Sequence, residues 1–381
     1  MRMVSAIGIR LPGTPNEERL RAAFAPPSPP TVGIEEEVML LDPRTLDLVP
    51  RAAEVLAALE GDDRFALELP AAQLELVVPP APSAGAAVAG LARARADVAR
   101  ALSGELRLAG AGLHPFASAI GELNSGERYD RTLAEHGDDA RRQLVFALQV
   151  HVAIRGEDRA LAVYNALRSY LPELAALAAN APFHGGRDTG LASARPGISI
   201  LLPRQGVPPA LGSWAEYAAA LAWVGDPSRW WWELRPHPLH GTLEIRVPDT
   251  QTTVGEAAAI VAVAQALAVR LADRHDAGQR LPADPSWRIE ENRRRAAHRG
   301  VEGELRDLRT GELVRTRERL HALLDELEPV AERLGSTEEL ARARRLVEAN
   351  GAVAMRAVAG SGPDLRRVTA WLADRFTAEI P

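Results

Sequence analysis

The sequence of 381 residues contains no cysteine, which excludes disulfides, thiolate nucleophiles and cysteine-ligated zinc. It also contains no lysine, so every fixed cation is an arginine. This excludes Schiff-base chemistry on a lysine and the lysine of a Walker phosphate loop. An excess of positive charge is missing too, because the formal net charge is -6. The chain therefore lacks the basic footprint of a nucleic-acid-binding protein, and we expect no nucleic-acid partner.

Long uninterrupted apolar runs are also scarce. The N-terminus has no apolar core of a signal peptide, and the most apolar later stretch, "EAAAIVAVAQALAVRLADRHDAG", is interrupted by Gln265 and Arg270. We therefore expect a cytoplasmic protein without a membrane span, in which this stretch is a buried helix. The hydrophobic content of 46% is sufficient for a substantial core.

The order of the apolar and polar segments predicts an α+β fold. Residues 1–30 end in "APPSPP", which cannot continue a helix or a central strand, so we expect an N-terminal arm followed by one domain over residues 31–381. Alanine-, leucine- and arginine-rich helical stretches separate the strand-like segments, and the chain is almost wholly helical from residue 253. Strands are expected at roughly 32–41, 72–78, 105–112, 143–154, 196–202 and 241–247. Because no short βαβ rhythm is visible, we expect an antiparallel sheet with helices on its outer face.

Two helices carry sequence signals for both ends. Thr253 and Glu256 have the spacing of a capping box, and Gly278 would end that helix. Ser336 and Glu339 have the same spacing, and Gly351 would end the second helix.

Charged residues recur on one side of the predicted strands. "TVGIEEEVMLLD" places Glu35 and Glu37 on one face, although strands are depleted in glutamate. "QLVFALQVHVAI" alternates in the same way, with Gln149 and His151 opposite its apolar residues. The same parity recurs for Gln73 and Glu75 in "AAQLELVV" and for Glu244 and Arg246 in "GTLEIRV". A solvated sheet face would explain any one of these strands, but four together indicate a shared polar site.

A convergent set of acids requires cations. Like charges a few ångströms apart repel by roughly 1 to 4 kcal/mol per pair, depending on the effective dielectric constant. Glutamate oxygens with one or two imidazoles suit Mg²⁺ or Mn²⁺, and magnesium held in this way keeps positions open for substrate phosphates. The pattern therefore indicates metal-dependent nucleotide chemistry.

Six motifs occur together in order: "GIEEE", "QLEL" followed by "PP", "QVHV", "ANAPFHGGRDTGLASAR", "WWELRPHPLHGTLEIRVPDTQ" and "ENRRRAAHRG". In order and approximate spacing they resemble the YbdK-type carboxylate-amine ligases, also called type 2 glutamate-cysteine ligases. The resemblance runs from about Thr31 to the C-terminal helices. It implies a glutamine-synthetase-like fold, in which a curved antiparallel sheet forms a polar funnel that holds ATP and two or three Mg²⁺ ions. It also implies phosphorylation of a carboxylate, typically the γ-carboxylate of glutamate, followed by amide formation with an amine.

The resemblance also implies roles for individual residues. Glu35, Glu37, Glu75 and Glu244 would be metal ligands, whereas Glu36 would point away from the site. Arg246 would stabilise the transferred phosphoryl group. Arginine suits that task because its planar fork binds phosphate oxygens in pairs.

His151 lies in a segment that often reads His-x-His in this superfamily, and Gln149 occupies the first of these positions. Glutamine is a weaker metal ligand than imidazole, so either Gln149 ligates a metal weakly or His151 alone contacts the nucleotide. The expected substrate- and nucleotide-binding residues are Arg187, Ser193, Arg195, Arg235 and Asn292. Asp188 lies in the same glycine-rich loop as Arg187, and Glu233 either pairs with Arg235 or reaches the site. Trp230, Trp231 and Trp232 are expected to be packing residues.

The sequence leaves the substrates open. A ligase that joins glutamate to cysteine and a γ-glutamyl ligase for a different amine would share these residues. A degenerate homologue that only binds nucleotide or ligand is a third alternative, motivated by Gln149. The expected partners are small molecules, namely ATP, glutamate or another carboxylate, and an amine; a homodimer remains open.

Overall fold

The alternating strands assemble into one antiparallel sheet of seven strands, with neighbours in the order β2-β3-β1-β5-β9-β8 and with β4 paired to β1. The structure is a computed structural model, and it describes residues 15–25, 29–226, 229–362 and 364–379. The strands are β1 Val32–Leu41, β2 Phe65–Leu67, β3 Gln73–Ala81, β4 Arg107–Ala109, β5 Leu148–Val152, β8 Leu234–His237 and β9 Thr242–Ile245. All of the strand pairs in this sheet are antiparallel. The predicted α+β class is thus confirmed.

Two short ribbons lie outside the main sheet. One pairs β6 Phe183–His184 with β7 Arg187–Asp188, and the other pairs β10 Glu304–Arg306 with β11 Leu313–Arg315. The second ribbon interrupts the helices of the C-terminal part, which is otherwise helical as predicted.

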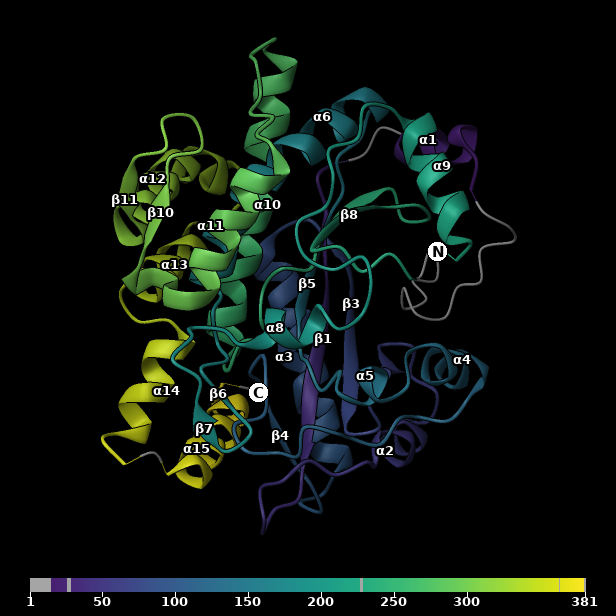
Figure 1. Ribbon diagram of the computed structural model, residues 1–381, viewed down its shortest axis with the longest axis vertical. Coiled ribbons are helices and arrows are strands. Elements are labelled where there is room, and N and C mark those ends of the chain that lie inside the picture. Colours follow the sequence, from purple (N-terminus) through teal and green to yellow (C-terminus); the bar gives the residue numbers. More distant parts are fainter. Residues whose placement is uncertain (1–14, 26–28, 227–228, 363, 380–381) are drawn as a thin grey trace.

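Helices occupy most of the remaining chain. Figure 1 shows α10, α11, α12 and α13 gathered on one side of the sheet. The first group of helices is α1 Glu17–Phe24, α2 Ala52–Ala58, α3 Ala84–Ala101, α4 Glu127–His136, α5 Asp138–Arg141, α6 Glu157–Leu167, α7 Leu171–Leu177, α8 Arg195–Ser199 and α9 Trp214–Val224. The second group is α10 Val254–Asp276, α11 Ser286–Arg299, α12 Thr316–Arg333, α13 Thr337–Glu348, α14 Gly351–Ala359 and α15 Leu365–Ala378.

The apolar face of the sheet forms the main core. Helices α3 and α10 pack against β1, β3 and β5, and their apolar side chains join those of the strands in one buried cluster. Helix α10 is long and apolar enough to cross a membrane, but 89% of its most apolar window is buried inside the protein. It is therefore the buried helix that the sequence predicts, and its capping box between Thr253 and Glu256 is formed.

One acid lies on this apolar face. Both carboxylate oxygens of Glu36 accept hydrogen bonds from Arg95 of α3, at 2.8 Å from Nε and 2.6 Å from Nη2. Both side chains are fully buried. Arg95 also donates to the carbonyl of Gln251 and lies over the ring of Phe376, 3.8 Å from its centroid. As expected, Glu36 points away from the polar site, and it ties β1 to α3 and α15.

Three sequence predictions differ from the structure. Residues 196–199 of the strand predicted at 196–202 belong to helix α8, because Pro196 occupies the first turn of α8, where its missing N–H costs nothing. The side chain of Ser336 makes no capping hydrogen bond to α13. Gly351 begins α14 instead of ending α13, because Asn350 caps α14. A β-carbon at Gly351 would lie 1.8 Å from Oδ1 of Asn180, so this position has no room for a side chain.

Helix α1 lies within the segment predicted as an arm. Asn16 caps it, and its Leu20 and Phe24 are fully buried in the main core. The ring of Phe24 packs against that of Trp214 of α9, with centroids 4.8 Å apart and planes inclined by 34°. Residues 17–24 therefore pack as part of the fold, whereas residues 1–14 and 26–28 of the predicted arm lie outside the described residues.

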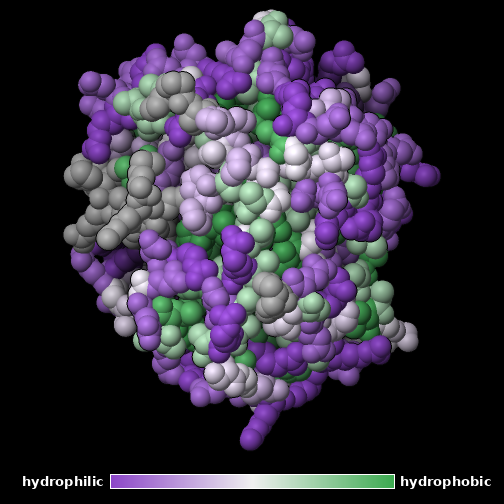
Figure 2. Space-filling view, turned by 180° about the vertical axis from the view of Figure 1, so that it is seen from behind, coloured by the Kyte–Doolittle hydropathy of each residue, from purple (hydrophilic) through white to green (hydrophobic). Residues whose placement is uncertain are grey.

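The surface combines charged and apolar areas. The face opposite to that of Figure 1 is hydrophilic around its rim and carries apolar residues in its middle (Figure 2). Large exposed hydrophobic side chains include Ile200, Trp223 and Trp287. Ile200 and Trp287 border the cavity described below.

Candidate active site on the polar face of the sheet

The register of the sheet places acidic and other polar side chains of four strands on one face. Across the strands, Glu75 of β3 faces Glu37 of β1, and Glu35 faces Gln149 of β5. His151 of β5 in turn faces Glu244 of β9. Because residues that face each other across an antiparallel pair share a side of the sheet, these six side chains form one group. The expectation of a shared polar face is confirmed, and all six are at most 6% exposed.

Glu35, His151 and Glu244 form the tightest cluster of this face. One ligand atom from each lies within 4.8 Å of those of the other two. His151 Nε2 is 3.5 Å from Glu35 Oε1. Among the described residues, neither His151 Nε2 nor Glu35 Oε2 has a hydrogen-bond partner. Buried lone pairs without donors are costly, and a divalent cation would satisfy them, so the donor set fits a metal.

Charge controls the ionisation of this cluster. Burial alone would raise the pKa of Glu35, but the adjacent His151 holds that pKa below its usual value. Burial likewise opposes the charged form of His151, yet Glu35 and Glu244 raise its pKa. The pKa of Glu244 is well below its usual value despite burial, because Arg235 and Arg246 lie beside it. The two acids are therefore ionised and available to a cation.

Arg246 and Gln149 connect this cluster to Glu37. Arg246 donates to Oε1 of Glu244 and to Oε1 of Gln149. Gln149 Nε2 donates to Glu37 Oε1 over 2.9 Å, and the backbone N–H of Ala147 donates to Glu37 Oε2 over 2.7 Å. Gln149 therefore bridges Glu37 and Arg246, and its carbonyl oxygen accepts from the arginine.

Glu37 and Arg246 line a cavity of about 970 Å³. The partly buried Glu68, from the loop between β2 and β3, lies in the same wall. Burial and the charge of Glu68 raise the pKa of Glu37 to about 7. This wall therefore holds more acid than its surroundings neutralise, and a bound cation would relieve the repulsion.

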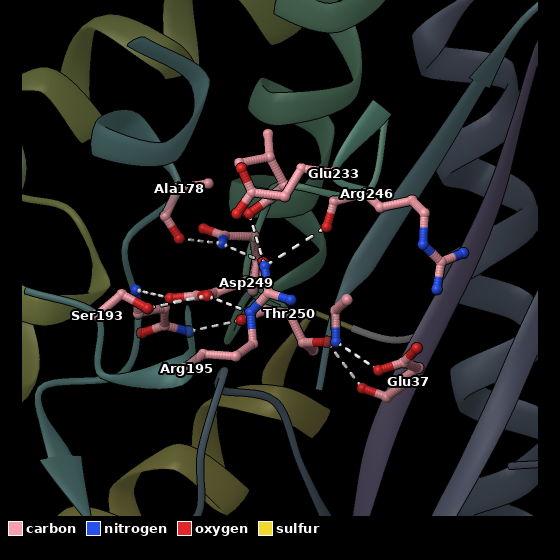
Figure 3. Close-up of polar contacts among 12 residues, drawn as sticks. Glu37, Ala178, Ser193, Arg195, Glu233, Arg246, Asp249 and Thr250 are labelled. Atoms are coloured by element: carbon pink, nitrogen blue, oxygen red, sulfur yellow. Dashed lines mark hydrogen bonds and ion pairs between the residues drawn. The ribbon is translucent and has the colours of Figure 1, made fainter. Parts of the chain in front are cut away.

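Ser193 and Arg195 lie in the same cavity wall and converge on Asp249 (Figure 3). Ser193 Oγ donates to Asp249 Oδ1 over 3.1 Å, and Arg195 Nε donates to the same oxygen over 2.6 Å. Arg195 Nη2 also donates to the carbonyl of Val247 over 2.6 Å. The guanidinium of Arg246 points away from this group in the figure. Asp249 therefore fixes a cation, Arg195, at the edge of the cavity.

The remaining predicted binding residues do not all reach the cavity. Arg235 donates to Glu244 Oε2 over 2.6 Å, while Glu233 pairs with Arg293, so the two do not pair with each other. Arg187 is exposed on β7, outside the residues that line the cavity, and its neighbour Asp188 pairs with Arg356. Asn292 is buried, and its amide bonds in both directions with the backbone of Arg306. The positions of Arg187 and Asn292 therefore do not support substrate contact.

The three neighbouring tryptophans also differ in whether they reach the cavity. Trp230 is buried and Trp232 packs against the main core, as predicted, whereas Trp231 lines the cavity.

Sequence reasoning missed several residues of the site. Asp249 stands in the quoted motif "RVPDTQ", and an acid just after a polar-faced strand was a usable signal. Glu68, Arg128 and Tyr129 also line the cavity. Arg128 and Tyr129 lie on an exposed amphipathic helix, α4, and no local pattern in the sequence marks their side chains as parts of a cavity wall.

Residues 31–370 match the family described as Glutamate-cysteine ligase family 2 (GCS2). The chain belongs to this family. A family relative from Rubrobacter xylanophilus, provisionally named glutamate–cysteine ligase 2-3, is 40% identical over 371 residues, which cover 93% of this chain and 99% of the relative. A protein of Thermobifida fusca with the provisional name glutamate–cysteine ligase 2 is 33% identical and is matched over 94% of both chains.

Two solved structures share the fold at low sequence identity. The glutamate–cysteine ligase of Francisella tularensis, solved in complex with AMP, matches with a TM-score of 0.66 and 13% identity over 94% of this chain and 91% of that one. The bifunctional glutathione synthetase of Pasteurella multocida also has a TM-score of 0.66, with 17% identity over 96% of this chain and 54% of that one.

Proposed function

We propose that this protein is an ATP-dependent carboxylate-amine ligase that activates the γ-carboxylate of glutamate and joins it to an amine such as cysteine. Membership of the glutamate-cysteine ligase family 2 supports the ligase class, and the provisional names of its relatives support the substrates. The AMP bound to the F. tularensis enzyme supports ATP as the nucleotide. The observation that carries the proposal is the buried cluster of Glu35, His151 and Glu244, linked through Arg246 to a large cavity.

The proposed reaction has two steps. An oxygen of the glutamate γ-carboxylate attacks the γ-phosphorus of ATP, the bond from that phosphorus to the bridging oxygen breaks, and ADP leaves. The amine nitrogen then attacks the carbonyl carbon of the resulting acyl phosphate. A C–N bond forms, the bond from that carbon to the phosphate oxygen breaks, and the nitrogen loses a proton. The products are an amide, ADP and phosphate.

Arg246 is the residue best placed to act on the phosphoryl group. It lines the cavity, and its contacts with Glu244 and Gln149 hold its guanidinium in one orientation. Phosphoryl transfer depends mainly on position and on the neutralisation of negative charge, and a fixed guanidinium supplies both. The neighbouring acids keep it charged, because Glu244 and Glu37 raise the pKa of Arg246 against the effect of burial.

The acids of the polar face would hold the cations. Glu35, His151 and Glu244 fit one divalent ion, Mg²⁺ or Mn²⁺, and Glu37 and Glu75 are proposed as ligands of a second. Such ions neutralise the phosphates of bound ATP. Arg195, fixed by Asp249, would bind the carboxylate of the substrate, with Ser193 beside it. These assignments belong to the proposal, as does a cytoplasmic location with only small-molecule partners.

The test is a product assay on the full chain. The protein is incubated with ATP, Mg²⁺, glutamate and a panel of amines that includes cysteine and hydroxylamine, and both phosphate release and the mass of any amide are measured. We expect glutamate-dependent phosphate release and an amide with at least one amine. Arg246→Gln should reduce the rate by about 100-fold or more, as does loss of one preorganised donor in other enzymes.

Arg309→Gln is the matched control, because Arg309 is exposed and is not among the residues that line the cavity. It should retain the rate of the wild type. ATP binding without glutamate-dependent phosphate release for any amine would overturn the ligase proposal and favour a protein that only binds nucleotide.

A further inference from the structure

Two further histidines adjoin the cluster of Glu35, His151 and Glu244. His237 ends β8, and His240 lies in the turn that leads to β9. Their rings are stacked, with centroids 4.1 Å apart and planes inclined by 13°. The ring of His151 lies 5.7 Å from that of His237 and 6.1 Å from that of His240. Three imidazoles and two carboxylates thus adjoin one another, and all of them except the half-buried His240 are buried.

The hydrogen bonds distinguish the roles of the two added rings. The backbone N–H of His240 donates to His237 Nδ1 over 3.1 Å. His237 therefore carries its ring hydrogen on Nε2 in the neutral form and offers no lone pair there. His240 Nε2 is buried without a hydrogen-bond partner among the described residues, as is His151 Nε2. His240 is the added ring with an unused ligand atom, and His237 supports it by stacking.

The ring of His151 is also oriented so that its Nε2 is directed at the cluster. Its Nδ1 lies 3.1 Å from the hydroxyl of Thr242, which leaves Nε2 facing Glu35. Thr242 begins β9, the strand that follows the turn with His240. This short segment therefore supplies both the candidate ligand His240 and the hydroxyl that orients His151. A hydrogen bond to the second ring nitrogen is the usual way in which proteins fix a metal-binding imidazole.

Gln149 does not supply a ligand atom to this cluster. Its carbonyl oxygen accepts from Arg246, so it is engaged within the protein and not directed at the cluster. The imidazole that a His-x-His segment would supply from β5 is absent here. A second imidazole is present instead on the opposite side of His151, in the turn between β8 and β9.

We propose that His240 joins Glu35, His151 and Glu244 as a fourth ligand, and that this position favours a transition-metal cation such as Mn²⁺ over Mg²⁺. Two imidazoles with two carboxylates are a softer donor set than the all-oxygen shell that Mg²⁺ prefers. The cation would draw the ring of His240 inward from its place beside the cluster. The proposal refines the metal position of the proposed function, but it concerns binding alone and is tested without turnover.

The first experiment measures metal affinity on chelator-treated full chain by calorimetry, with MnCl₂ and MgCl₂ as the probes. Wild type should bind Mn²⁺ more tightly than Mg²⁺. His240→Gln should weaken Mn²⁺ binding by about tenfold or more and change Mg²⁺ binding by less than about threefold. The matched control is His321→Gln, which alters a half-buried histidine on α12 that pairs with Glu348, outside the cluster, and should change neither affinity. Equal losses for both ions, or no loss for Mn²⁺, would overturn the proposal.

A second measurement requires no variant, in case His240→Gln does not fold. Pulsed electron paramagnetic resonance on wild type with one equivalent of Mn²⁺ counts the nitrogen nuclei bound to the ion. The proposal requires two coupled nitrogens, from His151 and His240, and a single nitrogen would refute it. Either result is independent of ligase activity, so failure of the metal proposal and failure of the proposed function are distinguishable.

Discussion

At the scale of single residues, each acid of the polar face has a different environment. Glu244 lies between two arginines, Glu35 faces an imidazole, and Glu37 has a raised pKa of about 7. Burial disfavours all three charges, so their different neighbours decide which acids are ionised before a cation binds. The acids of the site therefore differ in how readily they ionise, so the site is not a uniform acidic patch.

Glu75 lies opposite Glu37 and is fully buried, which allows its metal role to be separated from a packing role. We expect Glu75→Gln to reduce ligase activity by about 100-fold or more, because it removes a charged ligand. The free energy of unfolding of the metal-free protein should change by less than about 1 kcal/mol, since the substitution also removes a like charge beside Glu37. Thermal melts with a chelator and activity assays with Mg²⁺ check both parts.

The exposed Glu338 on α13 provides the control Glu338→Gln. A large loss of stability for Glu75→Gln in the absence of metal, with none for the control, would indicate that Glu75 is structural.

His114 gives a pH-dependent prediction that is separate from the catalytic site. Its Nδ1 accepts from the N–H of Ala117 over 2.8 Å, and its Nε2 donates to the carbonyl of Leu46 over 2.8 Å. Burial lowers its pKa to about 4, whereas an unfolded histidine has a pKa of about 6.5. Above pH 6.5 both states are neutral; below it the unfolded state binds the proton first. The free energy of unfolding should therefore fall by about 3 kcal/mol between pH 6.5 and pH 4.

Denaturant titrations at several pH values measure this loss. His114→Gln cannot take up the proton, so its stability should depend less steeply on pH over that range. Identical slopes for the two proteins would contradict the assignment.

At the scale of elements, the register of β1 decides which acids serve the site and which serves the core. Glu35 and Glu37 face the polar side, and Glu36 faces α3. The period of two residues in a strand made this division predictable from the sequence. The partner of Glu36 was not predictable, because Arg95 lies 59 positions further along the chain and looks like any other arginine of a helix.

The pair of Glu36 and Arg95 yields a prediction about stability. Glu36→Gln should destabilise the fold by about 3 to 5 kcal/mol, because it leaves the guanidinium of Arg95 buried without its counter-charge. The exposed pair of Arg51 and Glu54, 2.7 Å apart, is the control, and Glu54→Gln should cost at most about 1 kcal/mol. Chemical denaturation measures both. Equal, small losses would show that the buried pair contributes no more than a surface pair.

Errors of prediction at this scale have local physical causes. The segment from Pro196 contains isoleucines and leucines that favour a strand, but a proline in the first helical turn favours α8. Gly351 has the sequence signature of a helix end, yet it is required for close approach to Asn180. Alternation and capping signals in a sequence reflect only residues that are near one another in the chain. Contacts between distant segments can override them.

At the scale of the whole molecule, the sheet and the cavity suit the nucleotide-dependent ligase proposed above, and the family membership supports the ligase class. We expect ATP to bind in the presence of Mg²⁺ and to bind at least about tenfold more weakly with a chelator, because the acids around Glu37 repel unaccompanied phosphates. Calorimetry on the full chain measures both affinities. Equal affinities under the two conditions would contradict a metal-dependent site.

The sequence predicted the α+β class, the polar face and most of its acids, because these follow from periodicity and from motifs in order. It did not predict the cavity wall. Asp249 fixes Arg195, and Glu233 pairs with Arg293, across separations of 54 and 60 residues. Such pairs depend on how loops and helices meet in space, which no local pattern encodes.

The contact of Arg95 with Phe376 has a consequence for the order in which the protein is made. Glu36 is synthesised first, Arg95 and Gln251 follow, and Phe376 is synthesised after all three. During translation, α15 leaves the ribosome after β1 and α3, so Glu36 and Arg95 emerge before the ring of Phe376 is available to cover them. A nascent chain that is stalled before residue 376 should therefore hold the sheet in an incompletely closed state, open to proteases and chaperones until release.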